Sequence, residues 1–103
     1  MELISTRGKT PPTTFTKALF QSMAPDGGLF TPKMLPPLAS AALRGLEFRS
    51  VATTVAGHLL GDEIDLDALD GIVEDALDFP IPLVDIGDGI HVLELFHGPT
   101  LAF

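Results

Sequence analysis

An almost uninterrupted apolar run near the end of the chain limits the folds open to it. Residues 90–96 read Ile-His-Val-Leu-Glu-Leu-Phe, and a strand of this kind is usually buried on both faces. Residues 83–86 form a second strand candidate, joined to the first through Gly87, Asp88 and Gly89, which is a hairpin signal. A domain of 103 residues has little to cover both faces of such a hairpin. We therefore expect further protein to pack against it.

Short elements separated by proline and glycine are expected over the rest of the chain. Residues 2–5 have the composition of a strand, and a second extended piece begins at Leu29. Apolar residues at helical spacing predict three helices. The first covers residues 15–24, with Thr14 as its N-cap and Pro25 as its stop. The second covers residues 48–60 and ends at Gly61, and the third starts after Asp65.

These elements predict an α+β fold with about three helices on a small sheet and a C-terminal hairpin. Its core must consist mainly of aliphatic residues and phenylalanine, because tryptophan and tyrosine are absent. The residues expected to be buried are Phe15, Leu19, Val51, Val55, Leu59, Leu69, Ile72, Val73, Leu93 and Leu95.

The net charge of −8 disfavours nucleic acid and anionic membrane surfaces as partners, because both are bound through Lys and Arg. Ten of the fourteen carboxylates lie between Asp62 and Asp88. This stretch is either a cation site or, as we favour, a solvated helix face with turn residues. Asp65, Asp67 and Asp70 lack the alternating spacing of a calcium loop.

Metal chemistry and disulfides are not indicated either. The chain has no cysteine, and His58, His91 and His97 lack the spacing of metal ligands. The first residues do not combine a basic region with an apolar run, as a signal peptide would, and no stretch is apolar enough for a membrane helix. We expect a cytoplasmic protein.

The last ten residues combine a buried strand with a sharp break. The strand runs into His97, Gly98, Pro99 and Thr100, where Gly98 permits close approach of the backbone and Pro99 fixes φ. Strand-to-loop edges of this kind hold ligands in many α/β enzymes. An ordinary strand-to-helix loop would look the same from these residues alone.

Five collinear segments resemble the threonine synthase family. In that family a Lys-Asp pair directly follows the position occupied here by Phe103, and the lysine holds the cofactor. This chain departs from the family at Lys17, where an acidic residue is frequent. The matching segments are residues 5–8, 24–30, 60–64, 79–83 and 94–103.

The resemblance implies the N-terminal part of a fold-type II enzyme that uses pyridoxal 5'-phosphate (PLP). Such an enzyme converts O-phospho-L-homoserine and water to L-threonine and phosphate. Residues 1–82 would form its N-terminal domain, and residues 83–103 a hairpin and the start of the catalytic domain. The segment alone is expected to be inactive, to bind no cofactor, to require the remainder of the catalytic domain as its partner, and to self-associate. The alternatives are a non-catalytic packing domain and a segment of a related PLP-dependent phospho-lyase.

Site residues follow from the same resemblance. Thr100 and Phe103 would approach the cofactor because they lie close to the expected lysine. His97 would contact substrate or be a hydrogen-bonded loop histidine. Arg7 would bind a substrate phosphate or carboxylate, or form a surface ion pair. No catalytic residue is expected among these 103, since Lys9, Lys17 and Lys33 do not match the cofactor position.

Overall fold

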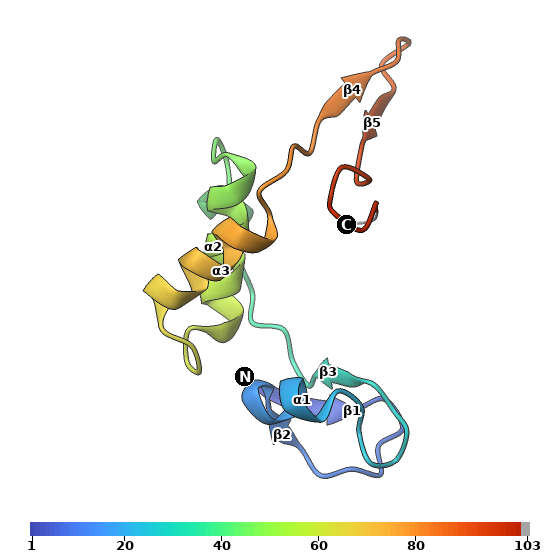
Figure 1. Ribbon diagram of the computed structural model, residues 1–103, viewed down its shortest axis with the longest axis vertical. Coiled ribbons are helices and arrows are strands. Elements are labelled where there is room, and N and C mark those ends of the chain that lie inside the picture. The colour runs from blue at the N-terminus through green and yellow to red at the C-terminus, as the bar shows by residue number, and fades with distance from the viewer. Residues whose placement is uncertain (102–103) are drawn as a thin grey trace.

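The computed structural model describes residues 1–101 and is elongated, measuring 49 × 28 × 27 Å. Three parts follow one another along its length (Figure 1): a small sheet with one helix, a pair of helices and a separate hairpin. Three helices with antiparallel sheets confirm the α+β prediction. The elements are β1 (Glu2–Ser5), β2 (Thr13–Thr14), α1 (Phe15–Gln21), β3 (Phe30–Pro32), a 3-10 turn η1 (Ser40–Ala42), α2 (Phe48–Leu60), α3 (Leu66–Ala76), β4 (Leu83–Asp85) and β5 (His91–Leu93).

The N-terminal unit is organised around β1, which lies between β2 and β3 in an antiparallel sheet. Leu3 and Ser5 are the buried positions of β1, as expected when alternate side chains point to one face. Ala18 of α1 and Ala24 of the following turn are buried as well. Small side chains at these positions allow the helix to lie close to the sheet.

Helix α1 begins as predicted and ends earlier. The Thr14 hydroxyl accepts a hydrogen bond from the amide of Lys17 at 3.4 Å, which is the expected N-cap. The predicted end at residue 24 is wrong, because Ser22 already has a φ of 63°. The amide of Ala24 then donates to the carbonyl of Gly28, so residues 22–24 belong to the turn and not to the helix.

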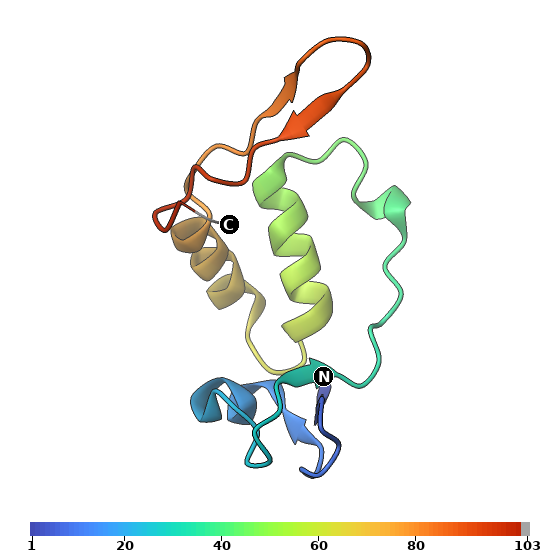
Figure 2. The same cartoon turned by 90° about the vertical axis from the view of Figure 1, so that its right-hand side faces the viewer.

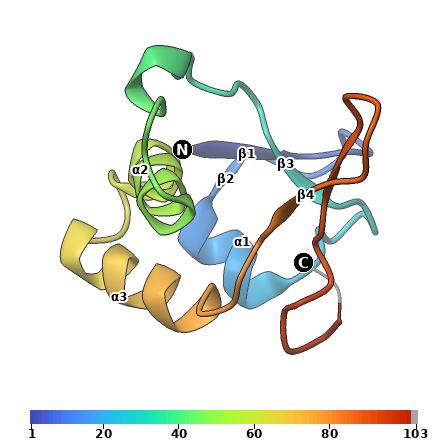
Figure 3. The same ribbon diagram turned by 90° about the horizontal axis from the view of Figure 1, so that it is seen from above.

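Helices α2 and α3 pack side by side and match the predicted ranges (Figure 3). The Asp65 carboxylate caps α3 by accepting from the amides of Asp67 and Ala68. Gly61 follows the last residue of α2, and only glycine fits there, since a Cβ would lie 2.5 Å from the carbonyl oxygen of Gly57. On the outer surface Arg49 pairs with Glu74 and Asp78.

The hairpin of β4 and β5 projects from the end of the helix pair (Figure 2). Its register pairs Leu83 with Leu93 and Asp85 with His91. The predicted loop is confirmed, with positive φ at Gly87, Asp88 and Gly89. Both strands are shorter than predicted. All of β5 is exposed, which agrees with the expectation that a chain of this size has little to cover both faces of the strand.

The predicted core is confirmed in part. Leu69 and Val73 are buried, and Phe15, Val51, Val55 and Leu59 are half-buried. The prediction is wrong for four residues that are exposed, because the described chain places no layer over their faces: Leu19, Ile72, Leu93 and Leu95.

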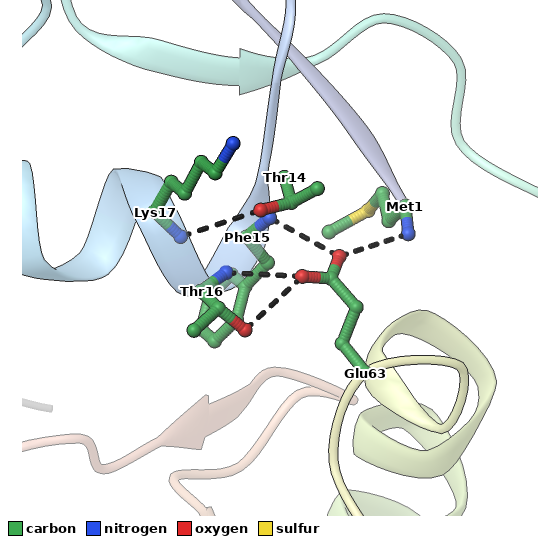
Figure 4. A network of polar contacts seen from close by, with 6 residues as sticks. All are labelled: Met1, Thr14, Phe15, Thr16, Lys17 and Glu63. Atoms are coloured by element: carbon green, nitrogen blue, oxygen red, sulfur yellow. Dashed lines mark hydrogen bonds and ion pairs between the residues drawn. The ribbon is translucent and has the colours of Figure 1, made fainter.

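One carboxylate joins the N-terminal unit to the helix pair (Figure 4). Glu63 lies in the turn between α2 and α3, and its Oε1 accepts from the Met1 α-amino group and the Phe15 amide, both at 3.1 Å. Its Oε2 accepts from the Thr16 amide at 3.0 Å and from the Thr16 hydroxyl at 3.2 Å. Glu63 thereby binds unpaired amides in the first turn of α1, where negative charge is favoured.

These contacts favour the ionised form of the carboxylate. The Thr16 amide has the largest effect, and together with the Phe15 amide and the terminal ammonium it lowers the pKa of Glu63 from 4.5 to about 2. Because the pKa is lower in the folded than in the unfolded chain, the stabilisation is complete above about pH 4.5. It is lost as the pH falls toward 2.

We predict that Glu63→Gln lowers the free energy of unfolding by about 1 kcal/mol at neutral pH, since a neutral amide is a weaker acceptor for these donors. The difference from wild type should shrink as the pH falls from about 4.5 toward 2. Urea unfolding at a series of pH values measures it. Asp75→Asn, which removes a charge from an exposed position of α3, is the control. A constant difference at all pH values would contradict the prediction.

Candidate functional site

The segment that follows β5 holds two of the predicted site residues. The amide of Glu94 donates to the carbonyl of Pro82 at 3.0 Å and so extends the pairing of the hairpin by one residue. The chain then leaves regular structure, and Gly98 is buried. The amide of Leu101 donates to the carbonyl of Gly98 at 2.9 Å, which closes a turn. Leu101 has a φ of 58°, a conformation that is costly for a branched residue.

His97 forms a pair with Glu94 inside this segment. Its Nε2 lies 2.6 Å from Oε2 of Glu94. The imidazole also lies against the ring of Phe96, with 4.7 Å between ring centroids and 36° between ring planes. His97 thus makes a hydrogen bond within its own loop, and its expected contact with substrate stays a prediction.

Thr100 is exposed within the turn that ends at Leu101. Phe103, the other residue expected to approach a cofactor, lies outside the described residues. The sequence therefore places two predicted site residues, His97 and Thr100, on one short segment whose backbone is folded back on itself.

Arg7 occupies a different part of the molecule. Its Nη1 donates to the backbone carbonyl of Asp26 at 3.0 Å, so the guanidinium bonds to a peptide group and not to a carboxylate as expected for a surface ion pair. The same nitrogen would lie 3.0 Å from a Cβ placed on Gly27. The N-terminal unit and the segment after β5 are separated along the long axis (Figure 1). The structure thus does not bring Arg7 and His97 into one cluster.

The carboxylate of Asp26 is the centre of the polar contacts around Arg7. Its Oδ1 accepts from the Ser5 hydroxyl at 2.7 Å and from the Gly28 amide at 2.9 Å, and its Oδ2 accepts from the Lys9 amide at 2.9 Å. The hydroxyl of Ser5, with help from these amides, lowers the pKa of Asp26 to about 2. The sequence predicted a turn at Asp26. It did not indicate the role of the Asp26 carboxylate in holding the loop that contains Arg7.

The lysines all belong to the first third of the chain. The Lys33 ammonium pairs with Glu2 at 2.7 Å, the Lys9 amide bonds to Asp26, and Lys17 lies in the first turn of α1. None of the three therefore follows the segment around His97 in the sequence. Among residues 1–101, no three His, Asp or Glu side chains are grouped closely enough to hold a metal ion. No helix in this range has the length and apolar character needed to cross a membrane.

A sequence model of the threonine synthase N terminus matches residues 2–77. The threonine synthase of Methylobacillus glycogenes is 36% identical over the whole chain, which corresponds to 25% of that protein. Threonine synthase-like 2 of Rattus norvegicus is 37% identical over 96% of the chain and 22% of its own length. The chain thus spans about a quarter of the length of the relatives it matches.

Solved structures agree with these sequence matches. The PLP-bound threonine synthase of Brucella melitensis is 40% identical and superposes with a TM-score of 0.88, covering all of this chain and 24% of that one. The Escherichia coli threonine synthase is 30% identical with a TM-score of 0.87, over 97% of this chain and 24% of its own.

We predict that Gly28→Ala destabilises the chain by about 1–3 kcal/mol, because the new Cβ would lie 2.1 Å from Oγ of Ser5 and 3.1 Å from the Arg7 amide nitrogen. Gly71→Ala is the matched control. Gly71 lies inside α3 with no atom within 4 Å of the added Cβ, so the same change should stabilise by up to about 1 kcal/mol. Thermal unfolding followed by circular dichroism measures both. Equal effects of the two variants would contradict the packing described around Asp26.

Proposed function

The chain belongs to the threonine synthase family, and from that premise we propose that it forms the N-terminal segment of an enzyme that makes L-threonine. The substrate is O-phospho-L-homoserine, and the products are L-threonine and phosphate. The observation that carries this proposal is the superposition of the whole chain on a PLP-bound threonine synthase at 40% identity. The activity belongs to a protein of the relatives' full length, of which this chain is about a quarter.

PLP is the proposed cofactor of that enzyme. When bound, it supplies an electron sink that permits phosphate to leave and water to add to the substrate carbon skeleton. The described residues do not fit PLP by themselves, since the chain's three lysines all lie in its N-terminal third and none matches the cofactor position of the family. We assign this segment one wall of the cofactor pocket, with Thr100 and Phe103 approaching the cofactor.

Two residues are proposed to face the substrate. His97 precedes Thr100 by three residues on the segment after β5 and is bonded to Glu94 there, which supports a place at the pocket wall. Arg7 is an exposed guanidinium on the N-terminal unit, and it suits an anionic substrate group approaching from that side.

The proposed division of the chain places residues 1–82 in an N-terminal domain and residues 83–103 at the start of the catalytic domain. Supporting this boundary, β4 begins at Leu83 and the hairpin projects away from the helix pair. The rest of the catalytic domain is the proposed partner of the hairpin. We place the enzyme in the cytoplasm, as expected for biosynthesis of an amino acid from a phosphorylated small molecule.

We expect the full-length protein containing this chain to release phosphate from O-phospho-L-homoserine and to form an equal amount of L-threonine. Phosphate detection and amino-acid chromatography measure the two products. The 103-residue chain alone should form neither product and should lack the absorbance band of lysine-bound PLP. Phosphate release without threonine would replace this function by that of a related phospho-lyase. Absence of both products would overturn the proposal.

The isolated chain should self-associate at micromolar concentration, because the hairpin exposes apolar side chains on both faces. Leu83→Gln combined with Leu93→Gln should reduce the association, since the two residues are paired across the strands and both are more than half exposed. Sedimentation velocity measures the change. Leu35→Gln combined with Leu29→Gln, at exposed leucines outside the hairpin, is the control. An equal reduction in both double variants would contradict the assignment.

A further inference from the structure

The pairing of Glu94 with His97 is unusual for its setting. The two residues are three positions apart, yet they lie outside any helix, so only the bend of the chain brings their side chains together. Glu94 and His97 have 25% and 33% of their side chains exposed. The polar pair is therefore partly covered, although it lies outside regular structure.

The contact determines which nitrogen of the imidazole carries a proton. An ionised carboxylate is only an acceptor, so Nε2, at 2.6 Å from Glu94 Oε2, must be the protonated nitrogen of neutral His97. Nδ1 is then the nitrogen with a free lone pair. The 2.6 Å separation is slightly shorter than the usual distance between a nitrogen donor and a charged oxygen acceptor.

Two further features limit movement of the ring. The Phe96 ring lies 4.7 Å from it, centroid to centroid, and the amide of Glu94 is bonded to the carbonyl of Pro82. Gly98, directly after His97, is buried and leaves no side chain between the imidazole and the following turn. The orientation of the ring is thus set by the hairpin and does not require a bound ligand.

We propose that Glu94 is a positioning residue that fixes the Nε2–H tautomer of His97 and presents Nδ1 to the substrate as a hydrogen-bond acceptor. This assignment rests on the proposed function, because it places His97 at the substrate. The chemistry it selects is an N–H or O–H donor, such as the substrate ammonium or a water molecule. A neutral imidazole held in this way does not donate from Nδ1 to the substrate phosphate.

Glu94→Gln tests the assignment with little change in shape. The glutamine amide can donate as well as accept, so it no longer imposes one tautomer on His97. In the full-length enzyme we expect kcat/KM to fall by about tenfold or more, as on loss of a bond to a charged group. Glu94→Asp keeps an acceptor-only carboxylate and should recover part of the loss. His91→Gln, at an exposed histidine of β5, should leave kcat/KM unchanged.

A spectroscopic measurement separates positioning from a general structural role. The enzyme is labelled with ¹⁵N-histidine, and ¹H–¹⁵N spectra are recorded at pH 8.5, where an ordinary imidazole is neutral. The His97 signals are assigned by their loss in His97→Gln. Wild type should show the Nε2–H tautomer, and Glu94→Gln should show a mixture or the Nδ1–H tautomer.

The outcomes are distinct. The same tautomer in wild type and Glu94→Gln, or an imidazolium at pH 8.5, would overturn the proposal. A change of tautomer without any change in kcat/KM would overturn the substrate-facing role of His97. A wild-type enzyme that forms no threonine would overturn the proposed function and, with it, the substrate-facing role of His97. The NMR spectra would still decide whether Glu94 fixes the tautomer of His97.

Discussion

The arrangement of this segment depends on the burial of one charged group in the turn between α2 and α3. The Glu63 carboxylate is surrounded by donors from β1 and α1, so it can be neither protonated nor removed without leaving amides unpaired. Few large apolar side chains are buried between the parts of the molecule. Hydrogen bonds and ion pairs therefore do much to fix the parts relative to one another, which a hydrophobic core does in larger domains. The position of the helix pair, and of the hairpin that follows it, derives from this contact.

Local patterns in the sequence identified the elements well where a side chain or glycine acts on its own neighbourhood. Thr14, Asp65 and Gly61 mark the helix boundaries in the structure as they do in the sequence. Burial could not be inferred in the same way. Ile72 and Leu93 belong to apolar patterns, but whether an apolar face is covered depends on neighbours that periodicity does not specify.

The residues of the candidate site also differ in whether a local sequence signal identifies them. The sequence indicated His97 and Thr100, because a glycine and a proline break the strand beside them. It did not indicate Glu94 as the partner of His97, since spacing of three residues brings side chains together in a helix and only by a particular bend elsewhere. The contact between Ser5 and Asp26 spans 21 residues and depends on the turn at Gly28. Such a contact has no local signature.

The order of the strands in the N-terminal sheet has a consequence for synthesis of the protein. Every pairing of β1 is completed by residue 32, whereas the Glu63 contact needs the whole of α2 and the turn after it to have emerged. The close contacts of β1 form early, whereas the contact of Glu63 with Phe15, 48 residues away in sequence, waits for chain closure. The N-terminal unit can thus assemble while the chain is still on the ribosome. The hairpin can pair its strands at that stage too, with its apolar faces still exposed.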